Sequence, residues 1–182
     1  MRKIRLYGTP LVAILALLAI VSYAVASNDG GKTHFKSDTL TGYQEVVGPG
    51  PISTVGTGTF VADLEGDTIT YTLTYSGLEG GAVTQAHIHF GQRAVGGGVI
   101  AFLCGGPTKP ACPASPATVT GTITPADIIG PNGQGIEPGS FDEAVRALRA
   151  GVVYANVHTT RWLMGEIRGQ VNDDNQRNEN AR

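Results

Sequence analysis

The chain has 182 residues, with 13 basic and 15 acidic side chains and a formal net charge of −2. Its length suits one domain of ordinary size, which can bury a core without an array of disulfides. The slightly acidic balance excludes the basic surface that nucleic-acid binding requires.

The first 26 residues predict a secretory signal peptide. Arg2, Lys3 and Arg5 form a cationic start, residues 11–26 are apolar, and small side chains precede the expected cleavage site. The apolar run is about 16 residues long, shorter than the roughly 20 of a membrane-spanning helix. This length favours cleavage over the alternative, a retained N-terminal anchor. We therefore expect a secreted or periplasmic protein with no stable membrane insertion.

Polar segments flank the central part of the chain. Residues 27–37 are polar and contain glycine, which predicts a flexible leader. Residues 172–182 consist almost entirely of Asn, Asp, Glu, Gln and Arg, which is typical of a disordered tail. One folded domain is expected between them, over residues 38–171.

The central part predicts an all-β domain. Alternation of apolar and polar residues is clearest at 68–75, where four apolar side chains are interleaved with threonines. A second alternating run, 59–64, joins it through a short turn as a hairpin. Further strands are expected at residues 38–43, 83–90, 99–103, 118–124, 151–158 and 166–171. About eight short strands predict a Greek-key-like β-sandwich or a flattened barrel.

Two short helices are expected among the strands. Residues 124–130 begin with a Thr-Pro pair and end at a Gly-Pro pair. Residues 140–151 begin with a serine and end at a glycine, and Phe141, Val145 and Leu148 form one apolar stripe. Both helices are expected to cover an edge or an end of the sheet.

The only two cysteines, Cys104 and Cys112, predict one disulfide. They lie on either side of a turn-rich stretch, and an exported protein folds in an oxidising compartment. The competing interpretation, a thiolate metal site, has too few ligands and the wrong spacing.

Three histidines are the strongest candidates for a functional site in this sequence. His87 and His89 are two residues apart in an expected strand, so both imidazoles point to the same face, opposite Ala86 and Ile88. The same alternation gives His158 the corresponding facing in a later strand. If the two strands are neighbours, three imidazoles can converge on one transition metal ion, with copper and zinc as the candidates.

A structural interpretation of these residues stays open. The histidine face could be exposed to solvent, or the rings could bond to backbone carbonyls. In the last strand, Glu166, Arg168 and Gln170 share one face. Glu166 or Gln170 could accept a histidine N–H and so orient a metal ligand. The pattern favours the alternative, in which Glu166 and Arg168 form a cross-strand clamp.

The order of several motifs adds a family resemblance. They occupy residues 40–47, 56–58, 68–78, 86–91, 99–103, 121–127, 154–159 and 165–170. This order resembles the CHRD domain, first named from chordin, over roughly residues 38–171. The resemblance implies a secreted β-sandwich and repeats the three histidines, but it brings no settled activity. The growth-factor antagonism of chordin depends on cysteine-rich modules, which a chain with two cysteines does not contain.

Three functions follow from this combination. The leading hypothesis is a secreted domain that binds a transition metal through His87, His89 and His158, with no catalytic residue assigned. The first alternative is an extracellular adhesion or matrix module that contacts a protein of the envelope or the surroundings. The second is a redox enzyme, because copper-zinc superoxide dismutases also carry a His-X-His strand and a later strand histidine on a Greek-key fold. That likeness is an analogy of fold and spacing.

Overall fold

The computed structural model describes residues 33–171. Its eight strands are β1 (His34–Thr41), β2 (Thr57–Glu65), β3 (Thr68–Ser76), β4 (Val83–Phe90), β5 (Gly98–Cys104), β6 (Ala117–Ile123), β7 (Val153–Thr159) and β8 (Ile167–Val171). The expected signal peptide at 1–26 and the expected tail at 172–182 lie outside the described residues. Strand β1 begins at His34, so residues 34–37 belong to the sheet and not to a flexible leader.

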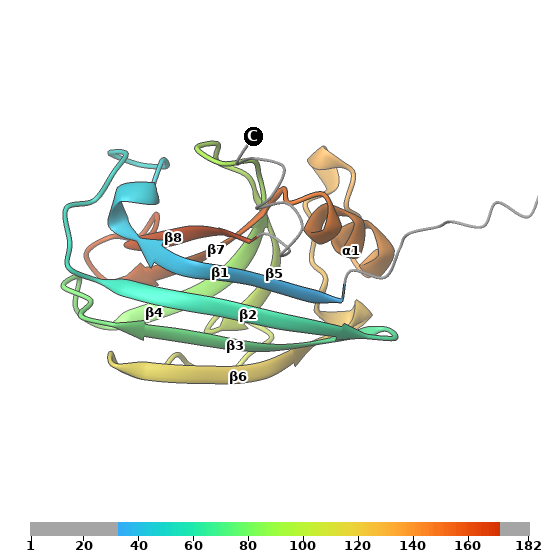
Figure 1. Ribbon diagram of the computed structural model, residues 1–182, viewed down its shortest axis with the longest axis horizontal. Helices are drawn as coiled ribbons and strands as arrows, with labels where there is room; N and C mark the ends of the chain where they lie inside the picture. Colours follow the sequence, from blue (N-terminus) through green and yellow to red (C-terminus); the bar gives the residue numbers. More distant parts are fainter. Residues whose placement is uncertain (1–32, 172–182) are drawn as a thin grey trace, which may run out of the picture. The chain divides into compact units, whose positions relative to one another are not determined.

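All eight strands belong to one antiparallel sheet. Their order is β5-β4-β7-β8-β1-β2-β3-β6, and the sheet curls until its two end strands, β5 and β6, face each other (Figure 1). The fold is therefore a nearly closed barrel, the second of the two predicted architectures. Between β8 and β1 the pairing is limited to one position, Thr41 opposite Arg168.

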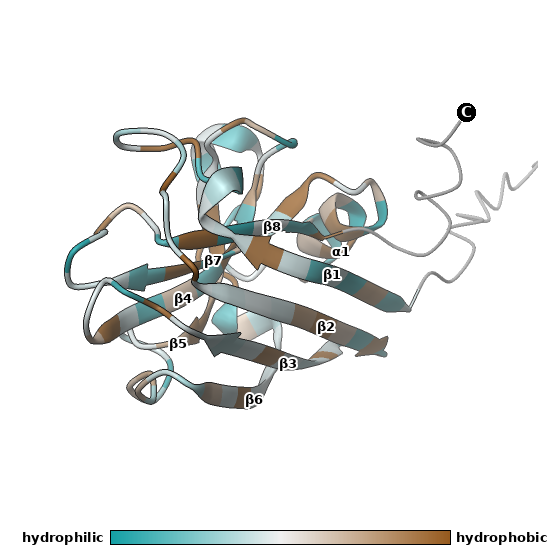
Figure 2. Cartoon of the chain, turned by 60° about the vertical axis from the view of Figure 1, so that its left-hand side comes forward, coloured by the Kyte–Doolittle hydropathy of each residue, from teal (hydrophilic) through white to brown (hydrophobic). Residues whose placement is uncertain are grey.

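The predicted alternation explains why the sheet has an apolar inside. Strands β2 and β3 pair without a break from Thr57 opposite Ser76 to Glu65 opposite Thr68. In β3 the side chains of Ile69 and Leu73 are buried in the core while the intervening threonines lie outside. Coloured by hydropathy, the strands show this mixture of apolar and polar positions (Figure 2).

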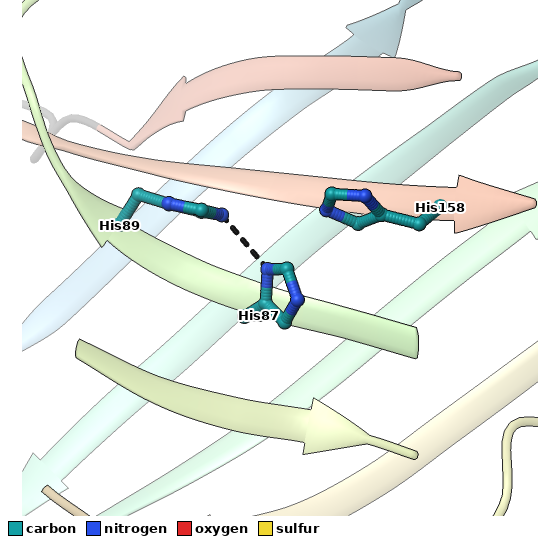
Figure 3. A group of neighbouring side chains, drawn as sticks. All are labelled: His87, His89 and His158. Carbon is teal, nitrogen blue, oxygen red and sulfur yellow. Dashed lines mark hydrogen bonds between the residues drawn. The ribbon is translucent and has the colours of Figure 1, made fainter. Parts of the chain in front are cut away.

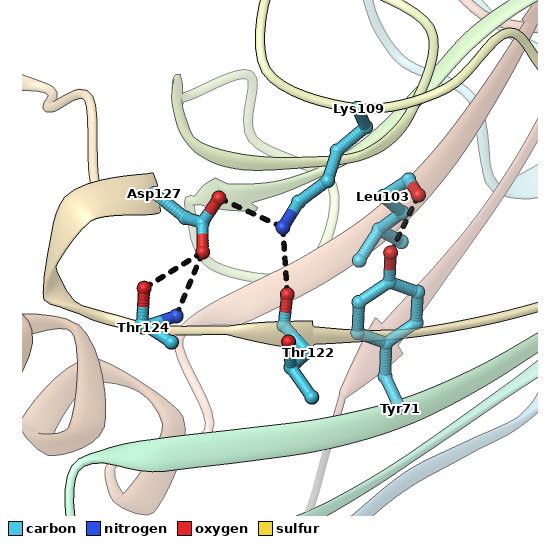
Figure 4. Close-up of polar contacts among 6 residues, drawn as sticks. All are labelled: Tyr71, Leu103, Lys109, Thr122, Thr124 and Asp127. Atoms are coloured by element: carbon cyan, nitrogen blue, oxygen red, sulfur yellow. Dashed lines mark hydrogen bonds and ion pairs between the residues drawn. The ribbon is translucent and has the colours of Figure 1, made fainter.

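Side chains bridge the seam between β5 and β6. The Tyr71 hydroxyl, on β3, donates to the Leu103 carbonyl oxygen on β5 at 2.6 Å (Figure 4). Lys109, in the loop that follows β5, donates to the Thr122 carbonyl oxygen on β6 and forms an ion pair with Asp127, both at 2.7 Å. These contacts hold the two end strands together where no ladder of backbone hydrogen bonds joins them.

The predicted disulfide between Cys104 and Cys112 is confirmed, and it closes the loop that follows β5. Replacing both cysteines with serine is expected to lower the free energy of unfolding by about 2–3 kcal/mol, because the loop then gains freedom in the unfolded chain. Urea denaturation of the oxidised wild type and the double variant measures this difference. The same urea midpoint in both proteins would contradict it.

One of the two expected helices is an α-helix. Helix α1 (Phe141–Arg149) buries Phe141, Val145 and Leu148, as its apolar stripe predicts. The other is only a short 3₁₀ turn, η2 (Pro125–Asp127). The Asp127 carboxylate accepts hydrogen bonds from the Thr124 backbone N–H and hydroxyl, which hold the turn but do not extend it. Two further 3₁₀ turns are η1 (Gly42–Gln44) and η3 (Asn132–Gln134).

Among the described residues, the longest helix has 9 residues, and none is long and apolar enough to cross a membrane.

Candidate metal centre

Strands β4, β7 and β8, together with the residue that precedes β8, carry polar side chains on the face that points away from the barrel core. We call this surface the polar face. Its members are His87, His89, Tyr154, Asn156, His158, Glu166, Arg168 and Gln170, and all of them are buried. The inward side chains of the same strands, such as Ile88, Val157 and Ile167, belong to the apolar core. The burial of the polar face therefore comes from loops that cover it from outside.

The three histidines meet because β4 and β7 are neighbours. Asn156 lies directly opposite His87, so His158, two residues further on, is the diagonal neighbour of His87 on the same face. The ring centres of His87 and His158 are 4.4 Å apart, and those of His87 and His89 are 4.7 Å apart. The predicted convergence of the three rings is confirmed (Figure 3).

Backbone carbonyl groups hold two of the three rings. The Nδ1 atom of His89 bonds to the Gly97 carbonyl oxygen, and that of His158 bonds to the Leu163 carbonyl oxygen, both at 2.9 Å. A side chain at position 97 would collide with the Phe90 carbonyl group, because a Cβ there would lie 1.8 Å from its oxygen. Glycine thus lets the loop approach closely enough to orient His89.

These bonds determine where the lone pairs lie. A carbonyl oxygen only accepts, so Nδ1 of both His89 and His158 carries the proton and each Nε2 keeps a lone pair. His87 Nδ1 lies 2.8 Å from His89 Nε2, which makes His87 the donor in the absence of metal. His158 Nε2 is buried and has no hydrogen-bond partner among residues 33–171.

Burial keeps the cluster uncharged. It lowers the pKa of His87 to about 2, helped by the neighbouring His158 and His89. It lowers the pKa of His89 to about 4 and also depresses the pKa of His158. All three rings are therefore neutral at pH 7, which is the state in which imidazole binds a metal.

The cluster suits a transition metal ion. One ligand nitrogen from each histidine lies within 4.8 Å of the other two. Nitrogens that share one ion at bonds of about 2.0–2.1 Å lie roughly 3.3–3.6 Å apart in trigonal or tetrahedral geometry. The unpartnered Nε2 of His158 and the hydrogen-bonded pair of His87 and His89 need only small side-chain shifts to reach that spacing. The residues thus fit a site with three imidazole ligands.

The sequence profile of the CHRD domain matches residues 37–171. The chain belongs to the CHRD domain family. The matched span runs from within β1 to the last residue of β8 and includes all three histidines of the cluster. Neither a curated protein nor a solved structure matches the chain significantly.

Glu166 and Gln170 do not orient the histidines of this CHRD domain. The Glu166 carboxylate accepts hydrogen bonds from Thr54, Glu79 and Gly80. The Gln170 amide donates to two backbone carbonyl oxygens. Within residues 33–171 neither side chain bonds to an imidazole, so the carbonyl groups of Gly97 and Leu163 take the supporting role for which the sequence offered Glu166 or Gln170 as candidates.

Arg168 also differs from the expected clamp with Glu166. Its guanidinium lies 3.4 Å over the Tyr154 ring, whose ring centre is 4.6 Å from that of His89 in a parallel stack. Its Nη2 donates to the carbonyl oxygens of Gln92 and Val95. Arg168 thereby fastens the loop that also supplies the Gly97 carbonyl group to His89.

Sequence reasoning missed Glu45. This side chain is 2 % exposed and accepts a hydrogen bond from Asn156 Nδ2 at 2.5 Å, on the polar face. Burial raises its pKa to about 8, although Arg168 and Asn156 act in the opposite direction. The residue stands after a short 3₁₀ turn and has no local pattern that could reveal its burial.

The raised pKa of Glu45 predicts a pH-dependent stability. Between about pH 4.5 and pH 8 the folded protein retains a proton that the unfolded chain releases, so stability falls as pH rises across this window. The loss is expected to reach at most about 5 kcal/mol. Glu45→Gln should abolish this pH dependence, so the stability of the variant relative to the wild type should increase towards pH 8. Urea denaturation of both proteins from pH 5 to pH 9 measures the difference, and a constant difference would contradict the assignment.

Proposed function

We propose that this CHRD domain is a secreted protein that binds one transition metal ion, copper or zinc, through His87, His89 and His158. The ligand atoms are Nε2 of His89, Nε2 of His158 and Nδ1 of His87, whose proton moves to its own Nε2 when the metal binds. The observation that carries the proposal is the buried lone pair of His158, which faces two further imidazoles and has no partner in the described part of the chain. A buried polar atom without a partner is costly, and a metal ion would satisfy it. Bound copper would supply redox chemistry, whereas zinc would supply only a Lewis acid.

The donor set favours these two ions. Imidazole suits copper and zinc, whereas calcium and magnesium prefer oxygen ligands. Copper(II) generally binds a given nitrogen site more tightly than zinc does. We therefore expect both ions to occupy the cluster, with copper displacing zinc when both are supplied.

Export from the cytoplasm is part of the proposal. The disulfide between Cys104 and Cys112 supports it, because such bonds persist in oxidising compartments. The predicted signal peptide points the same way, although it lies outside the described residues. A periplasmic or extracellular location agrees with both features.

The structure gives less support to the two alternatives. An adhesion surface formed by the histidine face would have to be accessible, yet His87, His89 and His158 are 3 %, 8 % and 5 % exposed. A dismutase-like copper site would use a fourth strand histidine beside these three. The remaining histidine of residues 33–171, His34, lies outside the cluster and contacts the Asp63 carboxylate at 2.6 Å.

Metal content tests the proposal. Protein purified without added metal and then dialysed against equimolar Cu²⁺ and Zn²⁺ is expected to retain about one ion per chain, measured by plasma mass spectrometry. His89→Ala should retain almost no metal, because the two imidazoles that remain are too few to hold the ion tightly. His34→Ala is the matched control and should retain as much as the wild type. Equal retention by His89→Ala and the wild type would refute the cluster as the site.

A further inference from the structure

A cavity of about 460 Å³ lies on the polar face over β8. Its walls include Glu45, Arg93, Arg168 and Gln170. The stacked ring of Tyr154 lies between Arg168 and His89, so the cavity is next to the histidine cluster but separate from it. None of the three histidines lines it.

Arg168 gives this cavity a buried positive charge. The side chain is 2 % exposed, and its Nη2 is occupied by two carbonyl oxygens of the 91–97 loop. Its Nη1 is buried and has no hydrogen-bond partner in the described part of the chain. A buried cationic N–H group without an acceptor is costly, so a ligand that supplies an acceptor would bind favourably.

A second arginine reinforces the charge. Arg93 lines the same cavity, is exposed, and forms no ion pair with another residue of the range 33–171. It lies close enough to Arg168 to depress the pKa of that guanidinium, after the larger effect of burial. Two like charges that share one cavity attract an anion more strongly than either does alone.

The acidic residue of the cavity does not neutralise these charges at pH 7. Burial raises the pKa of Glu45 to about 8, so its carboxyl group is mostly protonated there. The groups that face Glu45 are Arg168 on β8 and Asn156 and Tyr154 on β7. The two arginines therefore have no resident anionic partner among the residues that line the cavity.

The arginines need an acceptor from the ligand, whereas Gln170 needs a hydrogen-bond donor. Its amide nitrogen donates to the carbonyl oxygens of Gly91 and Gly151, which fixes the orientation of the amide. Its Oε1 atom is buried and accepts no hydrogen bond from the described residues. A ligand that fits the cavity should thus offer a hydrogen-bond donor as well as a negative group.

We propose that this cavity binds a small hydroxyl-bearing organic anion, whose carboxylate or phosphate group lies between Arg93 and Arg168 and whose hydroxyl donates to Gln170. The site does not depend on the metal, because none of its lining residues is a ligand of the ion. Arginine suits the anionic group because its planar fork donates two parallel hydrogen bonds to a carboxylate or a phosphate.

Calorimetric titration of the purified protein tests this site after metal has been removed on a chelating resin. The probes are galacturonate, glucose 6-phosphate and uncharged galactose, at pH 7 and 0.15 M NaCl. At least one of the two anions is expected to bind at least about tenfold more tightly than galactose, because charge-assisted hydrogen bonds form only with the anions. If galacturonate binds more tightly, the preferred anionic group is a carboxylate. If glucose 6-phosphate binds more tightly, it is a phosphate. Galactose binding as tightly as both anions would overturn the proposal.

Two variants locate the binding. Arg93→Gln removes an exposed charge and is expected to weaken anion binding about tenfold, whereas Arg161→Gln, the same change at an exposed position outside the cavity, leaves it unchanged. Arg168→Lys keeps the buried charge but loses the fork, and it should weaken binding as well. Unaltered affinity in Arg93→Gln, or an equal loss in Arg161→Gln, would overturn the assignment. Because metal is absent throughout, failure of the histidine site would not affect this result.

Discussion

A saturating concentration of Zn²⁺ is expected to raise the free energy of unfolding of the wild-type protein by about 4 kcal/mol when free metal exceeds the dissociation constant a thousandfold. The gain arises because the folded chain brings His87, His89 and His158 together, whereas the unfolded chain does not. His158→Ala should lose nearly all of this gain, since it removes the imidazole whose Nε2 has no other partner among the described residues. Urea denaturation with and without Zn²⁺ measures the gain for each protein.

For each protein, the zinc-dependent gain is the free energy of unfolding with Zn²⁺ minus the free energy of unfolding without it. His158→Ala also leaves a cavity, so the variant is expected to be less stable even without metal. That loss cancels when each protein is compared with itself. His34→Ala is the control and should keep the full gain, because this histidine contacts Asp63 outside the cluster. A gain in His158→Ala as large as in the wild type would show that zinc binds elsewhere.

Glu166→Gln is expected to lower the free energy of unfolding by about 2–3 kcal/mol. The carboxylate is 0 % exposed and accepts hydrogen bonds from the Thr54 hydroxyl at 2.8 Å and from the backbone N–H groups of Glu79 and Gly80 at 2.7 and 3.0 Å. A glutamine side chain replaces one acceptor oxygen with an NH₂ group, which then faces a donor. The variant therefore leaves a buried N–H group without an acceptor.

Glu137→Gln is a suitable control for this measurement. Glu137 is exposed, so the same chemical change is expected to alter stability by less than about 0.5 kcal/mol. Urea denaturation at pH 7 compares both variants with the wild type. Equal stability of Glu166→Gln and Glu137→Gln would mean that the three hydrogen bonds contribute nothing beyond what water supplies.

The packing around Gly80 explains why this carboxylate is so tightly held. A Cβ atom at position 80 would lie 1.9 Å from the Thr159 hydroxyl oxygen and 2.6 Å from Glu166 Oε2. The absence of a side chain lets the backbone N–H of Gly80 reach the carboxylate. Glu166 thus connects the segments before β2 and before β4 to the start of β8.

The orientation of the histidines could be predicted from the sequence because it is local. Side chains two residues apart on a strand share a face, whatever the rest of the protein does. The sequence therefore predicts His87 and His89 on one face, opposite Ile88, and the structure confirms it. The same rule predicts that His158 faces the same side as His87 and His89. Whether His158 lies next to them depends on β4 and β7 being neighbouring strands. Alternation within a strand does not reveal which strands pair.

The supporting contacts could not be predicted. Every residue has a carbonyl group, so nothing in the sequence marks those of Gly97 and Leu163 as the partners of His89 and His158. The sequence offers Glu166 or Gln170 as a candidate partner because their side chains share the face of the histidines. In the structure the Glu166 carboxylate and the Gln170 amide nitrogen bond to other groups, because loops distant in sequence fold over the polar face.

By itself, the sequence determined the strands, the apolar inside of the sheet, the disulfide and the common facing of the three imidazoles, since each depends on residues close together in the chain. The tertiary structure decided that the polar face is buried, that Glu45 is among its buried groups, and that Arg168 stacks on Tyr154 beside a cavity. Burial of a polar face requires a cover, and the cover here consists of irregular loops without periodicity. Only the packing of the whole domain establishes where such loops lie.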